Sequence, residues 1–430
     1  MNVTFKGYFF SDEARRYRSV TSRAKHHALT VHGTPGLWHN RPSLFETSMT
    51  MDLNSVHQRL HTGSKKWSQY PEDVLPMWVA DMDFPVAEPI VQALTARLQH
   101  PLLGYSVAQD TLRQTLVAHL ARHYDWQIKP EELVFLPGVE PGVNMALNAL
   151  VPKGSGVLVQ TPNYAPLLDA PGHWDLPRID LPFHADANGE YPTDIAALQR
   201  VLPQVRALLL SNPHNPLGKV FDAQELRAIG EACVQNDVLI VSDEIHADIL
   251  FDGRRHTPIA SLSPAIADRT VTLMSASKAW NIAGMKTAFA VIQNPDLRLR
   301  FNAGRLGLVD SVNALGLDAT QAAYSKGAPW LARVMAYLQD NRDYLANAIK
   351  TRFPGISMNL PQGTYLAWLD CAGLDIENPQ QFFLNEAKVA LSAGHEFGDD
   401  CGQFVRLNFG CPRSMLEEAL ARMERSLHRS

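Results

Sequence analysis

Lys278 is the first residue with the chemistry of a reactive group. It lies among small residues in Ser275-Ala276-Ser277-Lys278, directly after the apolar run of residues 271–274. Partial burial at the end of a strand would lower the pKa of a lysine and free its amine to form a Schiff base with a carbonyl group. The alternative for any single lysine is a solvated position on the surface. The assignment of Lys278 as a reactive group therefore needs support from other residues.

Two further chemical groups follow other apolar runs. Asp243 comes directly after residues 238–241, where a lone acid is also often a helix cap. Residues 137–144, which follow the run 133–136, form a glycine turn that opens into a helix whose free N–H groups suit a phosphate. Neither G-x-G-x-x-G nor G-x-x-x-x-G-K-[ST] occurs, which disfavours dinucleotides and nucleoside triphosphates.

The elements that must position these groups alternate between short apolar runs and longer amphipathic ones, which indicates strand and helix units of a mainly parallel sheet. The predicted strands are residues 133–136, 157–160, 207–210, 238–241, 271–274 and 288–292, and a helix is predicted over residues 223–235. Ligands bind beyond the carboxyl ends of such strands, so we expect the three groups at one edge of the sheet.

After Pro329 the pattern changes. A long helix is predicted over residues 330–352, then strands over 363–368 and 404–409, and a final helix over 415–427. With 430 residues the chain suits two domains.

Composition narrows the class of protein. Hydrophobic residues make up 46%, charged residues 19%, and the formal net charge is -5, so nothing favours nucleic acid or an anionic membrane as partner. The four cysteines form no C-x-x-C pair, which argues against a zinc site or disulfide framework and for reduced thiols in the cytoplasm. No apolar run reaches the roughly 18 residues of a membrane helix. A small-molecule substrate is therefore expected, without a metal.

Residues 1–50 differ from the rest because they are rich in Arg, Ser and His and poor in acidic residues. A disordered extension or an upstream start codon is predicted here, with a targeting signal as the alternative. Met49 and Met51 stand just before the first stretch of globular character.

Taken together, the motifs resemble the fold type I enzymes that use pyridoxal 5'-phosphate (PLP), the class I/II aminotransferase family. Residues 211–219 (Ser-Asn-Pro-His-Asn-Pro-Leu-Gly-Lys), 242–246 (Ser-Asp-Glu-Ile-His) and 275–278 (Ser-Ala-Ser-Lys) match three elements of that family in order and spacing. The resemblance implies an α/β fold, with a large domain built on a mainly parallel seven-stranded sheet and a smaller α+β C-terminal domain. The implied ranges are 51–96 for an N-terminal segment joining the small domain, 97–329 for the large PLP-binding domain and 330–430 for the small domain.

By this resemblance, Lys278 would hold PLP as a Schiff base and Asp243 would pair with its pyridine nitrogen. A carboxylate there keeps the nitrogen protonated, which makes the ring an electron sink. Asn215 would donate to the phenolic oxygen of the ring, and Tyr164 resembles the aromatic residue that stacks on the ring. His246 stands where many aminotransferases have a tyrosine and is included among the cofactor contacts.

The resemblance also implies contacts to the cofactor phosphate. These would come from the backbone around Val139 and Glu140, from the Ser275 hydroxyl and from Lys286. Many relatives have arginine at the last position, and a lysine lacks its bidentate fork. Tyr105 resembles the tyrosine that reaches the phosphate of a neighbouring subunit, which implies a homodimer with shared sites.

Arg406 resembles the arginine that binds the α-carboxylate of the substrate, a group that its planar fork fits. A surface ion pair is the alternative. If the resemblance holds here, the substrate is an α-amino acid.

A closer resemblance is to the MalY/PatB type of cystathionine β-lyase. It rests on residues 75–85 (Leu-Pro-Met-Trp-Val-Ala-Asp-Met-Asp-Phe-Pro), 138–142 and 243–248. It implies cleavage of L-cystathionine or another S-substituted cysteine, with the α-proton passing to the Lys278 amine, the thiolate leaving, and pyruvate and ammonia as further products. The same residues could serve an aminotransferase of an α-amino acid, and a PLP-binding regulatory protein is a third reading.

Overall fold

The computed structural model describes residues 52–428. The prediction for residues 1–50 therefore lies outside the described residues. None of the described helices is both long enough and apolar enough to cross a membrane.

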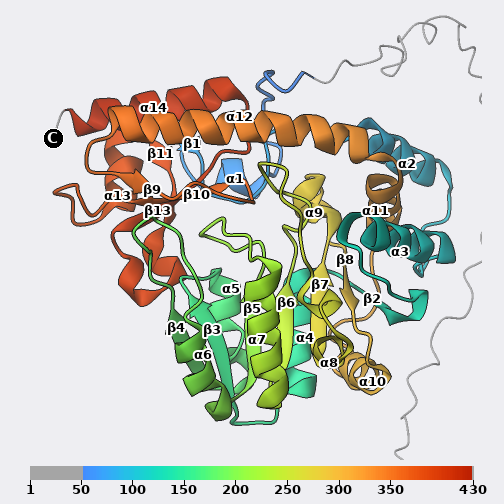
Figure 1. Ribbon diagram of the computed structural model, residues 1–430. Coiled ribbons are helices and arrows are strands. Elements are labelled where there is room, and N and C mark those ends of the chain that lie inside the picture. The colour runs from blue at the N-terminus through green and yellow to red at the C-terminus, as the bar shows by residue number, and fades with distance from the viewer. Residues whose placement is uncertain (1–51, 429–430) are drawn as a thin grey trace, which may run out of the picture. The chain divides into compact units, whose positions relative to one another are not determined.

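Seven strands form the largest sheet, in the order β2-β8-β7-β6-β5-β3-β4 (Figure 1). The bounds are β2 Leu133–Leu136, β3 Gly156–Thr161, β4 Arg178–Pro182, β5 Val205–Ser211, β6 Leu239–Asp243, β7 Thr270–Met274 and β8 Ala288–Val291. Neighbours from β7 to β4 are parallel, whereas β8 is antiparallel to both β7 and β2. Because β8 is antiparallel to both of its neighbours, β2 runs in the same direction as β6 and β7. The carboxyl ends of these three strands therefore lie at one edge of the sheet. The predicted mainly parallel seven-stranded sheet is confirmed.

Both faces of this sheet are covered because successive strand residues point to opposite sides. On one face, Val159 and Leu209 belong to the cluster that includes residues of α4 (Val139–Leu150). On the other face, Leu158 and Leu208 belong to the cluster that includes residues of α7 (Ala223–Gln235). Figure 1 shows α7 in front of the strands.

Two smaller sheets lie outside the large one. Four strands have the order β12-β13-β10-β9, with bounds β9 Ser357–Met358, β10 Leu366–Asp370, β12 Ser392–Ala393 and β13 Phe404–Asn408. β1 (Leu75–Pro76) pairs in parallel with β11 (Val389–Ala390), so the start of the described chain joins its final quarter. This pairing supports the prediction that residues 51–96 join the small domain; the domain ranges themselves stay predictions.

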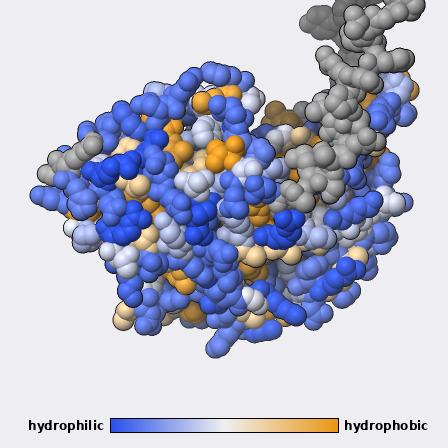
Figure 2. Space-filling model, turned by 90° about the horizontal axis from the view of Figure 1, so that it is seen from above, coloured by the Kyte–Doolittle hydropathy of each residue, from blue (hydrophilic) through white to orange (hydrophobic). Residues whose placement is uncertain are grey.

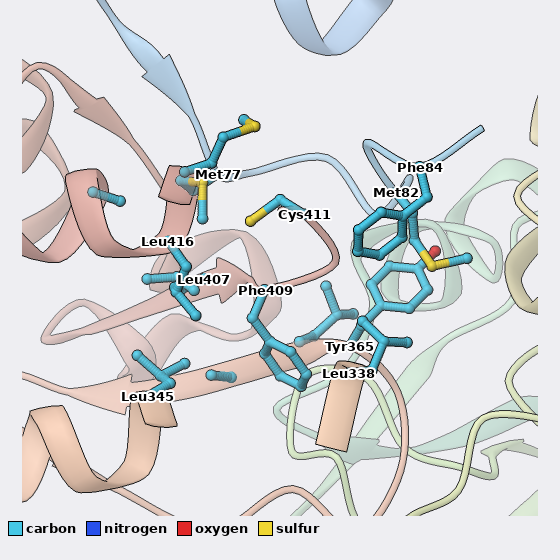
Figure 3. Packing of buried hydrophobic residues seen from close by; sticks show 14 of the residues in the cluster. Met77, Met82, Phe84, Leu338, Leu345, Tyr365, Leu407, Phe409, Cys411 and Leu416 are labelled. Carbon is cyan, nitrogen blue, oxygen red and sulfur yellow. The ribbon is translucent and has the colours of Figure 1, made fainter. Parts of the chain in front are cut away.

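The remaining helices are α1 Lys65–Ser68, α2 Glu88–Gln99, α3 Asp110–Tyr124, α5 Ala165–Asp169, α6 Ile195–Val201, α8 Pro264–Ala267, α9 Ala276–Ala279, α10 Pro295–Ala303, α11 Ala314–Lys326, α12 Ala328–Arg352, α13 Pro379–Phe382 and α14 Arg413–Leu427. The 25-residue α12 runs along one side of the molecule next to α14 (Figure 1). Residues of these helices, of β10 and β13, and of the segment before α2 form one buried cluster, part of which is shown in Figure 3.

The predicted strand over residues 363–368 is wrong at its start. Residues 362 and 363 donate their backbone N–H groups to the Gly218 carbonyl, and Thr364 donates to the Ile249 carbonyl. These residues therefore bind loops next to the large sheet, and the ladder begins only at Leu366. The edge strand β4 was not predicted because only Leu181 on it is buried.

Candidate active site

The candidate residues follow neighbouring strands of the large sheet. β6 ends at Asp243, and β7 ends just before Ser275, whose side chain caps the short helix α9 that carries Lys278. Asn215 follows β5, and the glycine turn between β2 and α4 follows the end of β2. The sheet thus delivers four chain segments to one edge, as the strand directions require.

Lys278 is partly buried, and its Nζ donates to the Ala80 carbonyl over 2.7 Å. Burial lowers the pKa of this lysine to about 8, and the nearby positive charge of Arg406 acts in the same direction. Near neutral pH, a usable fraction of the amine is therefore free of its extra proton, which a nucleophile or base requires.

Asp243 is buried at the end of β6, and its Oδ1 accepts from the backbone N–H of Ile245 at 3.0 Å. Burial raises the pKa of this carboxyl to about 7. A buried acid of this kind gains from a cationic partner, because pairing offsets the cost of burying its charge. Asp243 is thus suited to a protonated ring nitrogen.

His246 lies three residues further along the chain, buried, with its ring edge-on to the ring of Tyr365. Burial holds the pKa of His246 well below its usual value, so the imidazole is neutral. Its Nδ1 has no hydrogen-bond partner among the described residues. A buried nitrogen in this state fits a site that a polar ligand completes.

Arg406 brings the C-terminal part of the chain to the same site. Its Nη1 donates to Asn215 Oδ1 at 2.9 Å, and its Nη2 donates to the Trp78 carbonyl at 2.9 Å and to Ser392 Oγ at 3.1 Å. The guanidinium also lies over the Phe397 ring, 4.8 Å from its centroid. Burial lowers the pKa of Arg406 to about 10, so it remains a cation at neutral pH. The bond to Asn215 leaves the amide NH2 of that residue available as a donor.

Tyr164 and Glu140 meet at the start of α4. The Tyr164 hydroxyl donates to Glu140 Oε1 at 2.7 Å, and burial followed by the Glu140 charge raises the pKa of the phenol. Val139 is the first residue of α4, and no side chain among residues 52–428 caps this helix end. The backbone N–H groups of Val139 and Glu140 therefore remain available to an anion.

Three further residues predicted to contact the phosphate are Ser275, Lys286 and Tyr105, and that role stays a prediction for each. The Ser275 hydroxyl donates to the Thr287 carbonyl at 2.6 Å and lies 2.8 Å from Ser277 Oγ, so it is occupied within the fold. Lys286 is exposed, and no hydrogen bond or ion pair joins it to the other candidates within residues 52–428. Tyr105 is fully exposed. The structure of the single chain brings neither Lys286 nor Tyr105 next to the other candidate residues.

The structure adds residues 78–84, called here the bridging segment, to the site. The Trp78 carbonyl accepts from Arg406, and the Ala80 carbonyl accepts from Lys278 and, at 3.0 Å, from the Tyr365 hydroxyl. The sequence pattern of residues 75–85 was a family signature without an assigned role. Its contacts are made by main-chain carbonyls, which no residue type reveals.

Comparison with known proteins identifies the family of the chain. The family described as Aminotransferase class I and II matches residues 72–423. Cystathionine beta-lyase PatB of Bacillus subtilis (strain 168) is 36% identical over 391 residues, which cover 88% of this chain and 100% of PatB.

Solved structures agree with this result. The crystal structure of OvoB is 40% identical with a TM-score of 0.85, covering 88% of this chain and 99% of that one. The PLP-bound C-S lyase from Staphylococcus hominis is 31% identical with a TM-score of 0.82, covering 87% and 98%. The predicted fold type is thereby confirmed. On these grounds, this chain belongs to the class I and II aminotransferase family.

Proposed function

We propose that this protein is a PLP-dependent carbon-sulfur β-lyase, which cleaves L-cystathionine or another S-substituted cysteine to a thiol, pyruvate and ammonia. Two kinds of support converge on this activity. The site combines a lysine amine, a buried acid and a buried arginine, and the relatives named above include a cystathionine beta-lyase and a C-S lyase.

The residues of the site fit PLP. Lys278 has a partly deprotonated amine for its aldehyde, Asp243 has a buried carboxyl for its pyridine nitrogen, and Asn215 has a free NH2 group for its phenolic oxygen. The uncapped start of α4 suits its phosphate. Tyr164, held at its hydroxyl by Glu140, would stack on the ring. His246 would offer its unpaired imidazole nitrogen.

When bound, PLP supplies an electron sink for the pair left behind as the α-proton departs. The protein does the rest. Arg406 binds the α-carboxylate with its planar fork and so fixes which substrate bond faces the lysine. Once the substrate has displaced Lys278 from the cofactor, the free amine of Lys278 accepts the α-proton at Nζ. Departure of the β-thiolate then completes an elimination in which the electron pair of the broken C–H bond forms the new carbon-carbon double bond. The thiolate takes up a proton, and water hydrolyses the released 2-aminoacrylate to pyruvate and ammonia.

The observation that carries the proposal is that one backbone segment, residues 78–84, contacts both Lys278 and Arg406. An amine that moves the α-proton and an arginine that binds the α-carboxylate act on two groups bonded to the same substrate carbon, so they must be held at a fixed spacing. The bridging segment contacts both.

A homodimer is part of the proposal. Exposed apolar side chains gather at Leu102, Leu103, Tyr105, Val107, Leu306 and Leu308. Residues 106–108 and 310–312, next to these side chains, line one groove of about 690 Å³. A second copy that covers this region would bury the apolar side chains, and Tyr105 would then reach the phosphate in the partner's site.

The test is incubation of the PLP-reconstituted protein with L-cystathionine without a keto acid, following pyruvate and free thiol together. Equimolar catalytic release of both is expected. If neither accumulates while an added keto acid becomes its amino acid, the protein is an aminotransferase and the lyase proposal fails.

A further inference from the structure

We propose that the bridging segment sets the spacing between Lys278 and Arg406, and that Asn281 and Asn408 are the positioning residues that hold it. The inference rests on the proposed function for its purpose, although its geometry does not depend on which reaction is catalysed. Both asparagines lie close in the sequence to these two residues: Asn281 is three residues after Lys278, and Asn408 is two residues after Arg406.

Asn281 attaches the segment to the lysine side of the site. Its Oδ1 accepts from the backbone N–H of Met82 at 2.9 Å, and its Nδ2 donates to the carbonyls of Met82 and Phe84, both at 2.9 Å. Asn281 itself has a φ of 57°, a left-handed conformation that asparagine tolerates better than most residues. One side chain thus fixes the segment against the helix turn that carries Lys278.

Asn408 attaches the segment to the arginine side. It is fully buried, and its Nδ2 donates to the Val79 carbonyl at 2.5 Å and to the Asp81 carbonyl at 2.7 Å. These two carbonyls flank Ala80, whose own carbonyl accepts from Lys278. Asn408 lies on β13 with Arg406. It therefore holds the Ala80 carbonyl, which accepts from Lys278, next to the strand that carries Arg406.

The far side of the segment is held by charge. Asp83 is buried and receives Lys66 Nζ at 2.6 Å and Trp67 Nε1 at 2.9 Å, and Arg59 pairs with Asp81 at 2.9 Å. Figure 3 shows Met82 and Phe84 among the side chains of the buried cluster that also contains Tyr365. These contacts restrain the side chains of the segment, whereas the two asparagines hold its main chain.

Backbone carbonyls are fitting acceptors for this task. They carry no net charge and no titratable proton, so they hold an ammonium and a guanidinium without neutralising either. The Trp78 carbonyl also occupies part of the Arg406 fork, and the arriving carboxylate must share or replace that bond. The segment therefore contacts both residues that we propose to act on the amino-acid unit of the substrate.

The first experiment uses the cofactor-free protein, so it does not depend on catalysis. Acetic anhydride labels free amines, and mass spectrometry follows the labelling of Lys278 at pH 6.5 in the wild type, Asn281→Ala and Asn408→Ala. Loss of the fixed Ala80 acceptor would destabilise the ammonium and raise labelling roughly fivefold, the effect of about one hydrogen bond. Asn341→Ala is the matched control, because Asn341 is buried and donates to the carbonyls of Phe409 and Cys411 instead.

Labelling within twofold of the wild type in both asparagine variants would overturn the inference. So would an equal rise in the Asn341→Ala control, because general loosening would then be the cause.

The second experiment uses the PLP-loaded protein and compares the binding of L-alanine with that of ethylamine, which lacks the carboxylate, through the cofactor absorption. If the spacing matters, Asn281→Ala and Asn408→Ala weaken L-alanine about tenfold and ethylamine less than threefold, since one charge-assisted bond is misplaced. Equal weakening of both ligands contradicts the inference. Absence of pyruvate from the wild type would defeat the proposed function alone, because the labelling result stands independently.

Discussion

Replacement of Arg406 by lysine tests how the site binds a substrate carboxylate. The guanidinium makes three hydrogen bonds with its two terminal nitrogens, to Asn215, Trp78 and Ser392, so both arms of its fork are held in place. A lysine ammonium keeps the charge but supplies a single point of contact. The variant therefore loses at least one charge-assisted hydrogen bond to the carboxylate, about 1.5–3 kcal/mol.

In rate terms, we expect kcat/KM for L-cystathionine to fall roughly 10- to 150-fold in Arg406→Lys, since about 1.4 kcal/mol corresponds to a factor of ten. In Arg406→Ala both arms of the guanidinium are lost, so kcat/KM should fall by about the square of that factor. The assay follows pyruvate with lactate dehydrogenase, after the cofactor absorption has shown that PLP is bound. Arg342→Lys is the control, because Arg342 is equally buried but pairs with Asp252.

A fall of less than threefold in Arg406→Lys would refute the reasoning, as would a similar fall in Arg342→Lys. The first result would mean that the carboxylate binds elsewhere. The second would mean that loss of any buried guanidinium disturbs the fold.

Three further predictions address the cofactor, pH and stability. Lys278→Ala should lose both the covalently bound cofactor absorption and turnover, and normal turnover would exclude the lysine from catalysis. In the cofactor-free protein, Asp243 has its pKa raised from 3.8 to about 7, so the folded state holds a proton that the unfolded chain releases. This group makes stability fall as pH rises from about 4 to about 7, and Asp243→Asn should flatten that part of the profile of Tm against pH. Phe409→Ala should cost about 3–5 kcal/mol in urea unfolding of the cofactor-free protein, because Phe409 is fully buried, and a loss below about 1 kcal/mol would contradict this packing.

Much of the fold could be predicted because its elements carry their own signals. The helix predicted over residues 223–235 matches α7, where Asp222 accepts from the Glu225 N–H and a stripe of buried residues faces the sheet. The buried strands were equally clear, since both of their faces are apolar. Edge strand β4 was missed for the opposite reason, because only Leu181 on it is buried. The strand predicted from residue 363 began too early because residues 362–364 bind the carbonyls of Gly218 and Ile249 instead of a ladder.

The site divides in a similar way. Lys278, Asp243 and the glycine turn of residues 137–144 could be found because they lie at the ends of strands whose carboxyl ends meet at one edge, whereas Asn215 was found only through the family resemblance. Their roles, and those of Lys286 and Tyr105, stay predictions. Asn281, Asn408 and the carbonyls that they hold could not be found from residue types alone, because a carbonyl is present at every position and only the folded chain shows which ones face the site.

The bridging segment has a consequence for the biosynthesis of the protein. Its hydrogen bond to Lys278 joins residues 198 apart in the sequence, and its bond to Arg406 joins residues 328 apart. A ribosome therefore synthesises the bridging segment first, Lys278 about 200 residues later and Arg406 more than 100 residues after that. Until then the growing chain can form the central sheet and the segments that we propose for PLP, but it lacks the arginine that we propose for the substrate carboxylate. Loss of residues 406–430 should leave a chain that cannot become competent, a defect that added PLP cannot rescue.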